Sequence, residues 1–197
     1  DIEKFSAAFG KLVLEKNAYK QGEVKIVIGR DGRTSGEMVR GIVVRTLTAL
    51  GIRVVDLGLS TTPTVEVAVK MENADAGIIL TASHNPEEWN ALKLLNEKGE
   101  FISAEEGERV LKIAEEPLLL QHSGAAQDRL KTDDSYLQKH INAILQYPLV
   151  NAEAIAAKNY KVVVDAINST GAIFVPALLN ALGVKDVVVL NKEVTGK

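Results

Sequence analysis

The stretch AGIILTASHNPEEWNALK, residues 76–93, joins a short apolar run to a cluster of polar side chains. Ala76–Leu80 predicts a buried strand, because a short apolar run bounded by turn-forming residues is typical of one. Ser83, His84 and Asn85 follow close behind it. The carboxyl ends of strands are where open α/β sheets bind their ligands. The stretch therefore predicts a strand and a candidate site at its end.

Short β-branched runs alternate with longer amphipathic segments on both sides of this stretch, which indicates βαβ units around a largely parallel sheet. The fold class that we predict is α/β, a three-layer α/β/α arrangement with a mixed, largely parallel sheet, followed by an incomplete second βαβ unit. The expected strands are Val24–Ile28, Arg53–Leu57, Ala76–Leu80 and Asn90–Leu95. The expected helices cover the amino terminus, Glu37 to about Leu50, a segment capped by Thr62, a segment with the capping box Ser103/Glu106 and an apolar stripe including Val110 and Leu111, and a segment from Tyr136 towards Pro148.

The chain divides into two predicted domains, residues 1–150 and 151–197. Residues 121–134 mix small and charged side chains without periodicity, so we expect a loop there. After residue 150 the pattern predicts a strand at 161–165, a helix at 171–182 and a strand at 186–190. Two strands and one helix are marginal as a domain. This unit is therefore expected to pack on the first domain or to belong to something longer.

The composition excludes several classes of protein. The 197 residues are 46% hydrophobic, carry a net charge of -3 and include no cysteine, which excludes disulfides and thiolate metal sites. No apolar run approaches the ~20 residues that span a bilayer, and the amino terminus does not resemble a secretory signal. Scattered basic residues and 5% aromatics do not favour nucleic-acid binding. We expect a cytoplasmic protein with neither a membrane nor a nucleic acid as partner.

The residues of TASHNP, 81–86, admit several interpretations. A serine nucleophile with His84 as its base is disfavoured, because neighbours in an extended segment point to opposite sides and no G-x-S-x-G elbow surrounds Ser83. Asn85 precedes Pro86, which favours an extended backbone and a loop whose amide groups face a ligand. An ordinary turn built of turn-forming residues is the alternative.

Lys93 and the segment GRDGRTSG, residues 29–36, are further candidates. Lys93 lies among aliphatic neighbours, where an ammonium group needs an anion such as phosphate or a wet cleft, unless it faces solvent from an edge strand. Arg30 and Arg33 precede the amino terminus of a predicted helix, which favours anion binding. Alternatively, Asp31 pairs with one arginine and Thr34 or Ser35 caps the helix. The segment matches neither a Walker loop nor a dinucleotide-binding fingerprint.

TASHNP, with a lysine ten positions after its serine and GRDGRTSG upstream, closely resembles the α-D-phosphohexomutase family of phosphoglucomutases, phosphomannomutases and phosphoglucosamine mutases. The resemblance covers residues 1 to about 150 as the first domain of that family. VVVDAINSTG, with the helix and strand expected after it, resembles the opening of the second domain.

The resemblance implies a function and roles for individual residues. Ser83 would carry a phosphoryl group, pass it to a sugar phosphate and recover it from a hexose 1,6-bisphosphate intermediate. Lys93 would be the general acid or base, His84 and Asn85 would line the phosphoryl site, and Arg30 would bind phosphate. Mg²⁺ would bridge the phosphoryl oxygen on Ser83 and three aspartates of a D-x-D-x-D loop, which suits a cation that prefers oxygen ligands.

The chain also departs from the family pattern. No D-x-D-x-D loop occurs in the 197 residues, and the arginine-containing segment that normally precedes the first helix is absent. We therefore expect a fragment of a phosphohexomutase, with little or no activity alone, whose parent performs Mg²⁺-dependent phosphoryl transfer through Ser83. A non-catalytic phosphosugar-binding or interaction module with the same fold is the alternative. The identity of the sugar and the oligomeric state stay open.

Overall fold

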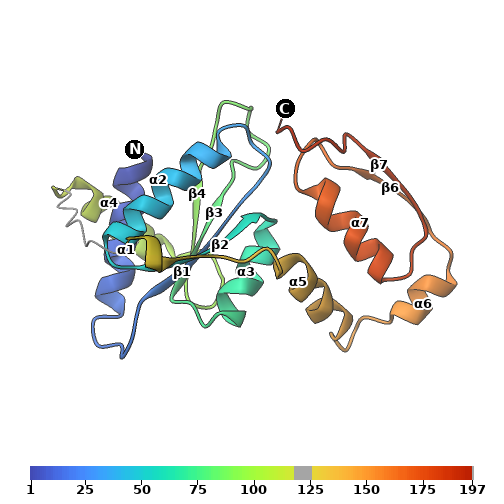
Figure 1. Cartoon of the computed structure of the whole chain (residues 1–197), viewed down its shortest axis with the longest axis horizontal. Coiled ribbons are helices and arrows are strands. Elements are labelled where there is room, and N and C mark those ends of the chain that lie inside the picture. The colour runs from blue at the N-terminus through green and yellow to red at the C-terminus, as the bar shows by residue number, and fades with distance from the viewer. Residues whose placement is uncertain (118–125, 197) are drawn as a thin grey trace.

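The computed structural model describes residues 1–117 and 126–196 (Figure 1). Its elements in chain order are α1 (Ile2–Lys16), β1 (Lys25–Arg30), α2 (Gly36–Ala49), β2 (Arg53–Leu59), α3 (Thr62–Met71), β3 (Ala76–Leu80), β4 (Leu92–Leu95), α4 (Ala104–Glu115), the short 3₁₀ helix η1 (Ala126–Arg129), β5 (Leu130–Thr132), α5 (Tyr136–Leu145), α6 (Ala152–Ala157), β6 (Lys161–Asp165), α7 (Gly171–Ala181) and β7 (Asp186–Leu190).

The main sheet has the strand order β4-β3-β1-β2-β5. All neighbouring strands in it are parallel except β3 and β4, which are antiparallel and place Lys93 opposite Ile79. The carboxyl ends of β1, β2 and β3 therefore lie at one edge of the sheet. The prediction of a mixed, largely parallel sheet is confirmed.

Helices cover both faces of this sheet. Along β1, Ile26 and Ile28 pack in a cluster with residues of α1, α2 and α4, whereas Val27 packs with residues of α3. This alternation follows from the two-residue period of a strand, whose successive side chains point to opposite faces. Figure 1 shows α1, α2 and α4 gathered on one side of the sheet and α3 on the other. The three-layer α/β/α prediction is therefore confirmed.

Local capping residues account for the starts of α3 and α4, although the predicted cap of α3 is wrong by one residue. The predicted capping box of Ser103 and Glu106 is present at α4. The N-cap of α3 is Thr61 rather than Thr62, because the Thr61 hydroxyl is the group that accepts from the Thr64 N–H, at 3.3 Å. Leu111, expected in the apolar stripe of α4, is 57% exposed and lines a hollow at the surface.

The predicted loop at residues 121–134 is partly wrong. Residues 126–129 form η1, and β5 pairs in parallel with β2 through Val54, Val55 and Asp56. A three-residue strand is too short to show a periodic pattern, and the exposed edge of β2 supplies its partners. Residues 121–125 lie outside the described residues. The strand expected from Asn90 begins two residues later, at Leu92.

The second unit contains the expected parallel strands β6 and β7 with α7 between them, and also α6, which was not predicted from the sequence. Figure 1 shows this unit at the opposite end of the molecule from α1 and α4. It contacts the first unit where the Gly32 N–H donates to Ser169 Oγ, at 3.1 Å. Val163, in the middle of β6, is 67% exposed, so one face of the small sheet is uncovered within the described chain.

Candidate functional site

Ser83 lies in the loop directly after β3, and its side chain is exposed. Its φ angle is +54°, in the left-handed region that residues with a side chain adopt at a cost of about 1–2 kcal/mol. The Ser83 N–H donates to Thr81 Oγ1 at 3.1 Å, and the Thr81 hydroxyl donates to Asp31 Oδ2 at 2.6 Å. The ends of β1 and β3 thus cooperate in fixing the backbone at Ser83.

The left-handed turn brings the Ser83 and His84 side chains together. Ser83 Oγ lies 3.5 Å from His84 Nδ1, at the outer limit of a hydrogen bond. The expectation that the two side chains point to opposite sides is wrong, because the segment is not extended at Ser83. His84 is therefore close enough to interact with the serine hydroxyl.

Arg33 lies beneath the serine loop and is 8% exposed. Its Nη1 donates to the carbonyls of Pro86 and Trp89, and its Nη2 donates to the carbonyls of Ser83 and Asn85, all at 2.7–2.9 Å. Its Nε lies 3.4 Å from Asp31 Oδ2. The alternative in which Asp31 pairs with an arginine is thus the one that the structure shows. The N-cap of α2 is Ser35, but its hydroxyl makes no capping hydrogen bond and accepts instead from Asn90 Nδ2.

Two cavities adjoin Ser83 and His84. A cavity of about 490 Å³ is lined by residues at the ends of β2, β3 and β6 and in the segments after them, including Ser60–Pro63, Asp165–Ile167 and Ser169–Gly171. A second cavity, of about 230 Å³, adds Arg33, Asn85 and Glu87 to the lining. Asp31, Ser83 and His84 line both. The serine hydroxyl therefore lies where two parts of the chain meet around open space.

The structure brings only some of the predicted site residues together. Asn85 lines the smaller cavity, and its Nδ2 donates to the Ala82 carbonyl at 3.0 Å. Arg30 pairs instead with Glu37, with Nη2 3.1 Å from Oε2, and also donates to the Asp31 carbonyl. Among the described residues, the lining of these two cavities includes neither Arg30 nor Lys93.

Lys93 is half-buried on the face of the sheet that α3 covers, opposite Ile79, which lines the larger cavity. Its Nζ lies 5.9 Å from the centre of the Phe101 ring. Burial raises the pKa of the Glu66 carboxyl, while the positive charge of Lys93 lowers it. Lys93 therefore shares a sheet face with the larger cavity and has an acidic neighbour on α3.

Several residues at the cavities were not predicted from the sequence, although they follow strands as Ser83 does. Ser60 and Thr61 follow β2 at the same sheet edge as Ser83. Ser60 is 3% exposed and its Oγ has no hydrogen-bond partner among the described residues. Asp165 is the last residue of β6, and Ser169 lies in the segment after it. Polar residues at or after the end of a predicted strand were the available sign in both cases.

His140 on α5 also reaches this region, without any sign in the sequence. Its Nδ1 lies 2.9 Å from the Thr64 hydroxyl, which in turn lies 2.8 Å from the hydroxyl of Thr61. Burial lowers the pKa of His140, so the neutral ring is favoured. A line of hydrogen bonds therefore connects α5 with the amino terminus of α3 at the cavity.

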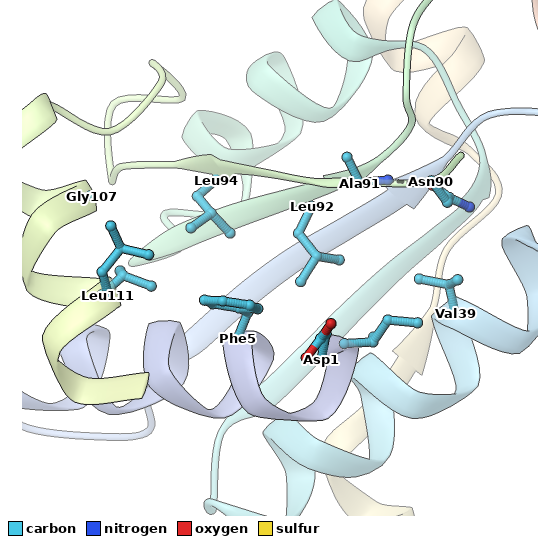
Figure 2. Close-up of a pocket in the computed structure, with 11 residues that line it drawn as sticks. Asp1, Phe5, Val39, Asn90, Ala91, Leu92, Leu94, Gly107 and Leu111 are labelled. Carbon is cyan, nitrogen blue, oxygen red and sulfur yellow. Dashed lines mark hydrogen bonds between the residues drawn. The ribbon is translucent and has the colours of Figure 1, made fainter. Parts of the chain in front are cut away.

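A third hollow, of about 480 Å³, lies away from Ser83 between α1, β4 and α4. Figure 2 shows Leu92 and Leu94 of β4 pointing toward Phe5 of α1, with Asp1 at one side. Its lining is almost entirely apolar and contains none of the predicted site residues. The candidate site is therefore the pair of cavities at Ser83.

No group of three or more histidine, aspartate or glutamate side chains converges within residues 1–117 and 126–196 to hold a metal ion. Asp31, the carboxylate beside Ser83, is already engaged by the Thr81 hydroxyl and Arg33. These residues therefore do not by themselves form a Mg²⁺ site. In the same ranges, no helix is both long enough and apolar enough to span a bilayer.

The site is thus an exposed serine at the carboxyl end of β3 in an α/β/α domain. The family model for phosphoglucomutase/phosphomannomutase, alpha/beta/alpha domain I, matches residues 1–119. The chain therefore belongs to the phosphoglucomutase/phosphomannomutase family.

Individual relatives agree with this assignment. A phosphoglucosamine/phosphogalactosamine mutase of Sulfurisphaera tokodaii is 36% identical over 163 residues, which cover 82% of this chain and 35% of the relative. A probable phosphoglucosamine mutase of Pyrococcus furiosus is 38% identical over 175 residues, covering 89% and 37%. The crystal structure of a putative phosphomannomutase from Thermus thermophilus superposes with a TM-score of 0.84 at 24% identity, covering 99% of this chain and 42% of the other, which supports the fold alone. The chain thus spans between 35% and 42% of the length of each of these relatives.

Proposed function

We propose that this chain is part of a phosphohexomutase, in which Ser83 carries a phosphoryl group and exchanges it with a phosphorylated hexose. The observation that carries the proposal is the position of the Ser83 hydroxyl, exposed at the end of β3, beside His84 and facing two cavities. Phosphoryl transfer asks a protein mainly to position the reacting groups and to stabilise charge. A hydroxyl held by a fixed backbone turn suits that requirement.

The proposed step is a direct displacement at phosphorus. A bond forms between Ser83 Oγ and one phosphorus of a hexose 1,6-bisphosphate, while the bond from that phosphorus to its sugar oxygen breaks and the serine hydroxyl proton passes to that oxygen, so that a hexose monophosphate is released. In the reverse transfer, the phosphoryl group on Ser83 goes to the free hydroxyl of a hexose monophosphate that carries its phosphate at the other position, which regenerates the bisphosphate. His84 Nδ1, 3.5 Å from Oγ, is placed to hold the hydroxyl or an oxygen of the transferred group. Asn85, in the smaller cavity, is proposed to line the same phosphoryl site.

Lys93 is proposed as the general acid or base for the sugar hydroxyl, as the family resemblance implies. Its place on the α3 face of the sheet, opposite Ile79, supports this assignment. Arg30 is the proposed phosphate ligand for which the geometry offers least support, because its guanidinium pairs with Glu37. Mg²⁺ dependence also stays a prediction, in which an oxygen on Ser83 would be one ligand and the cation would offset the charge of the transferred phosphoryl group.

The remaining features of the proposal concern the whole protein. Residues 1–150 are proposed to form the phosphoserine domain and residues 151–197 the beginning of the next, with a cytoplasmic location and a phosphorylated hexose as substrate. Because the chain spans only 35–37% of two mutase relatives, we also propose that it has little or no turnover alone. Conversion of hexose 1-phosphate to hexose 6-phosphate by the purified 197-residue chain would overturn that last statement.

The proposal is tested by Ser83→Ala in the longest form of the protein that contains this chain, assayed for interconversion of hexose 1- and 6-phosphates. Turnover should fall to the uncatalysed background, because the phosphoryl acceptor is removed. Ser103→Ala is the control: this serine caps α4 outside both cavities, so it should lower stability by about 1 kcal/mol and leave turnover intact. An active Ser83→Ala variant would overturn the role of Ser83, whereas a wild-type protein that binds a hexose phosphate without turnover would favour the alternative of a binding module.

A further inference from the structure

Arg33 makes contacts of a kind that leave it little to offer a ligand. Each of its two Nη atoms donates to two main-chain carbonyls, which belong to Ser83, Asn85, Pro86 and Trp89. A guanidinium group carries five N–H donors, and these four bonds use all of the Nη hydrogens. The remaining Nε is buried, lies 3.4 Å from Asp31 Oδ2 and has no hydrogen-bond partner among the described residues.

The four carbonyls span the whole turn that carries the serine. All of them face inward onto one buried cation, although residues 83–89 are themselves exposed. Three main-chain amides of the same loop are hydrogen-bonded: Ser83 to Thr81 Oγ1, Asn85 to the Ala82 carbonyl and Trp89 to the Pro86 carbonyl. The loop is therefore folded around the guanidinium group rather than around a ligand.

The strain at Ser83 explains why such an anchor is needed. A serine at a φ of +54° persists only where its surroundings fix it, because an extended or helical backbone costs less. Arg33 binds the carbonyl of this residue, and the Asp31–Thr81 pair binds its N–H. Both peptide groups that flank the Ser83 α-carbon are thereby held.

We propose that Arg33 is a positioning residue, whose guanidinium group sets the main-chain conformation of residues 83–89 and thereby directs the Ser83 hydroxyl into the cavities. It acts through the backbone and does not itself bind phosphate. The catalytic consequence of this positioning rests on the proposed function, whereas the effect on the loop does not. A lysine cannot replace this group, because an ammonium has only three N–H donors, all on one nitrogen. It therefore cannot donate to all four carbonyls as the planar guanidinium group does.

The test compares Arg33→Lys with wild type and with Arg53→Lys, an exposed arginine on β2 that pairs with Glu23. Hydrogen–deuterium exchange on the 197-residue chain should be faster at the amides of Ser83, Asn85 and Trp89 in Arg33→Lys, with β1 and β3 unchanged. In the longest form of the protein, kcat for hexose phosphate interconversion should fall at least about tenfold with KM unchanged, because a displaced hydroxyl loses reactive geometry rather than substrate affinity. Arg53→Lys should match wild type in both measurements.

The outcomes separate this proposal from the proposed function. Unchanged exchange in the loop, or a raised KM with unchanged kcat, would overturn the positioning role. If the wild-type protein shows no turnover, the proposed function fails, and the exchange measurement alone decides whether Arg33 holds the loop. If Arg33→Lys does not fold, Thr81→Val removes the other support of Ser83 without burying a free charge, and the same pattern should appear with a smaller amplitude; an unchanged loop would then count against the proposal.

Discussion

Two loops that line the larger cavity adopt the same unusual backbone conformation by different means. The loop after β3 has Ser83 at a φ of +54°, and the loop after β6 has Ile167 and Asn168 at +44° and +52°. The first is anchored by buried Arg33. The second is anchored by Asp165, whose Oδ1 accepts from the Ile167 N–H and from Asn191 Nδ2 at an exposed position.

The difference shows what makes a strained turn costly to disturb. Ile167 is 70% exposed, so water is able to replace any hydrogen bond lost there. Arg33 is 8% exposed, and removal of its side chain would take the guanidinium donor from four main-chain carbonyls and the ion-pair partner from Asp31. We infer that the serine loop is rigid because its polar contacts are buried, whereas the second loop is stabilised only locally.

The largest expected effect is that of Arg33→Ala on the stability of the chain. The free energy of unfolding should fall by about 3–5 kcal/mol, because removing one partner of a buried ion pair leaves an uncompensated charge. Urea denaturation followed by circular dichroism measures this. Arg109→Ala, which breaks an exposed pair with Glu15, should cost at most about 1 kcal/mol. Equal losses in the two variants would contradict the comparison.

Thr81→Val should have the next largest effect. It removes both the hydroxyl that Asp31 accepts and the oxygen that receives the Ser83 N–H, at a cost of about 1–3 kcal/mol. Thr81→Ser keeps the hydroxyl and should retain most of the stability. The same denaturation experiment applies, and a valine variant as stable as wild type would show that the Thr81 hydroxyl does not support the Ser83 backbone.

The segment after β2 provides an intermediate case, because half-buried His140 supports it through Thr64. His140→Gln should cost about 1 kcal/mol at about pH 7.5 through the lost hydrogen bond. Burial lowers the pKa of folded His140 below the ~6.5 of the unfolded chain, so the unfolded state binds more protons as the pH falls through that value. Wild-type stability should therefore decline more than that of His140→Gln between about pH 7.5 and about pH 5.5. Parallel declines of the two unfolding midpoints would refute this.

The smallest effect is expected for Asp165→Asn in the second loop. Hydrogen bonds from Asn191 and from the Ile167 N–H lower the pKa of Asp165, but the carboxylate is fully exposed and an asparagine oxygen still accepts both bonds. The thermal midpoint at neutral pH should not change measurably. A loss as large as that of Thr81→Val would mean that the two loops are anchored alike.

Most of the fold follows from local sequence patterns. Ala76–Leu80 is a strand with the predicted bounds because its apolar run is bounded by polar residues, and the Ser103/Glu106 capping box begins α4 because it depends on two residues three positions apart. By contrast, β5 was missed, because a strand of three residues has no period and depends on its partner β2. Short-range sequence patterns thus predict individual helices and strands better than they predict which strands pair with each other.

The sequence predicts the location of the candidate site but not the backbone conformation of Ser83. The position of Ser83 at the end of a strand is visible in the sequence, because a sheet edge gathers whatever follows its strands. Its left-handed backbone and its approach to His84 depend on Arg33, which lies 50 residues away along the chain. Every residue has a main-chain carbonyl, so a hydrogen bond to one does not require a particular residue type. Nothing in TASHNP therefore identifies Arg33 as the donor to these carbonyls.

The most direct test of the account is peptide mass spectrometry on the longest form of the protein, before and after incubation with a hexose 1,6-bisphosphate and Mg²⁺. The account predicts one phosphoryl group, confined to Ser83 and absent from Ser83→Ala. A protein that stays unmodified, or that is phosphorylated at another residue instead, would contradict the assignment of Ser83 as the group that carries phosphate.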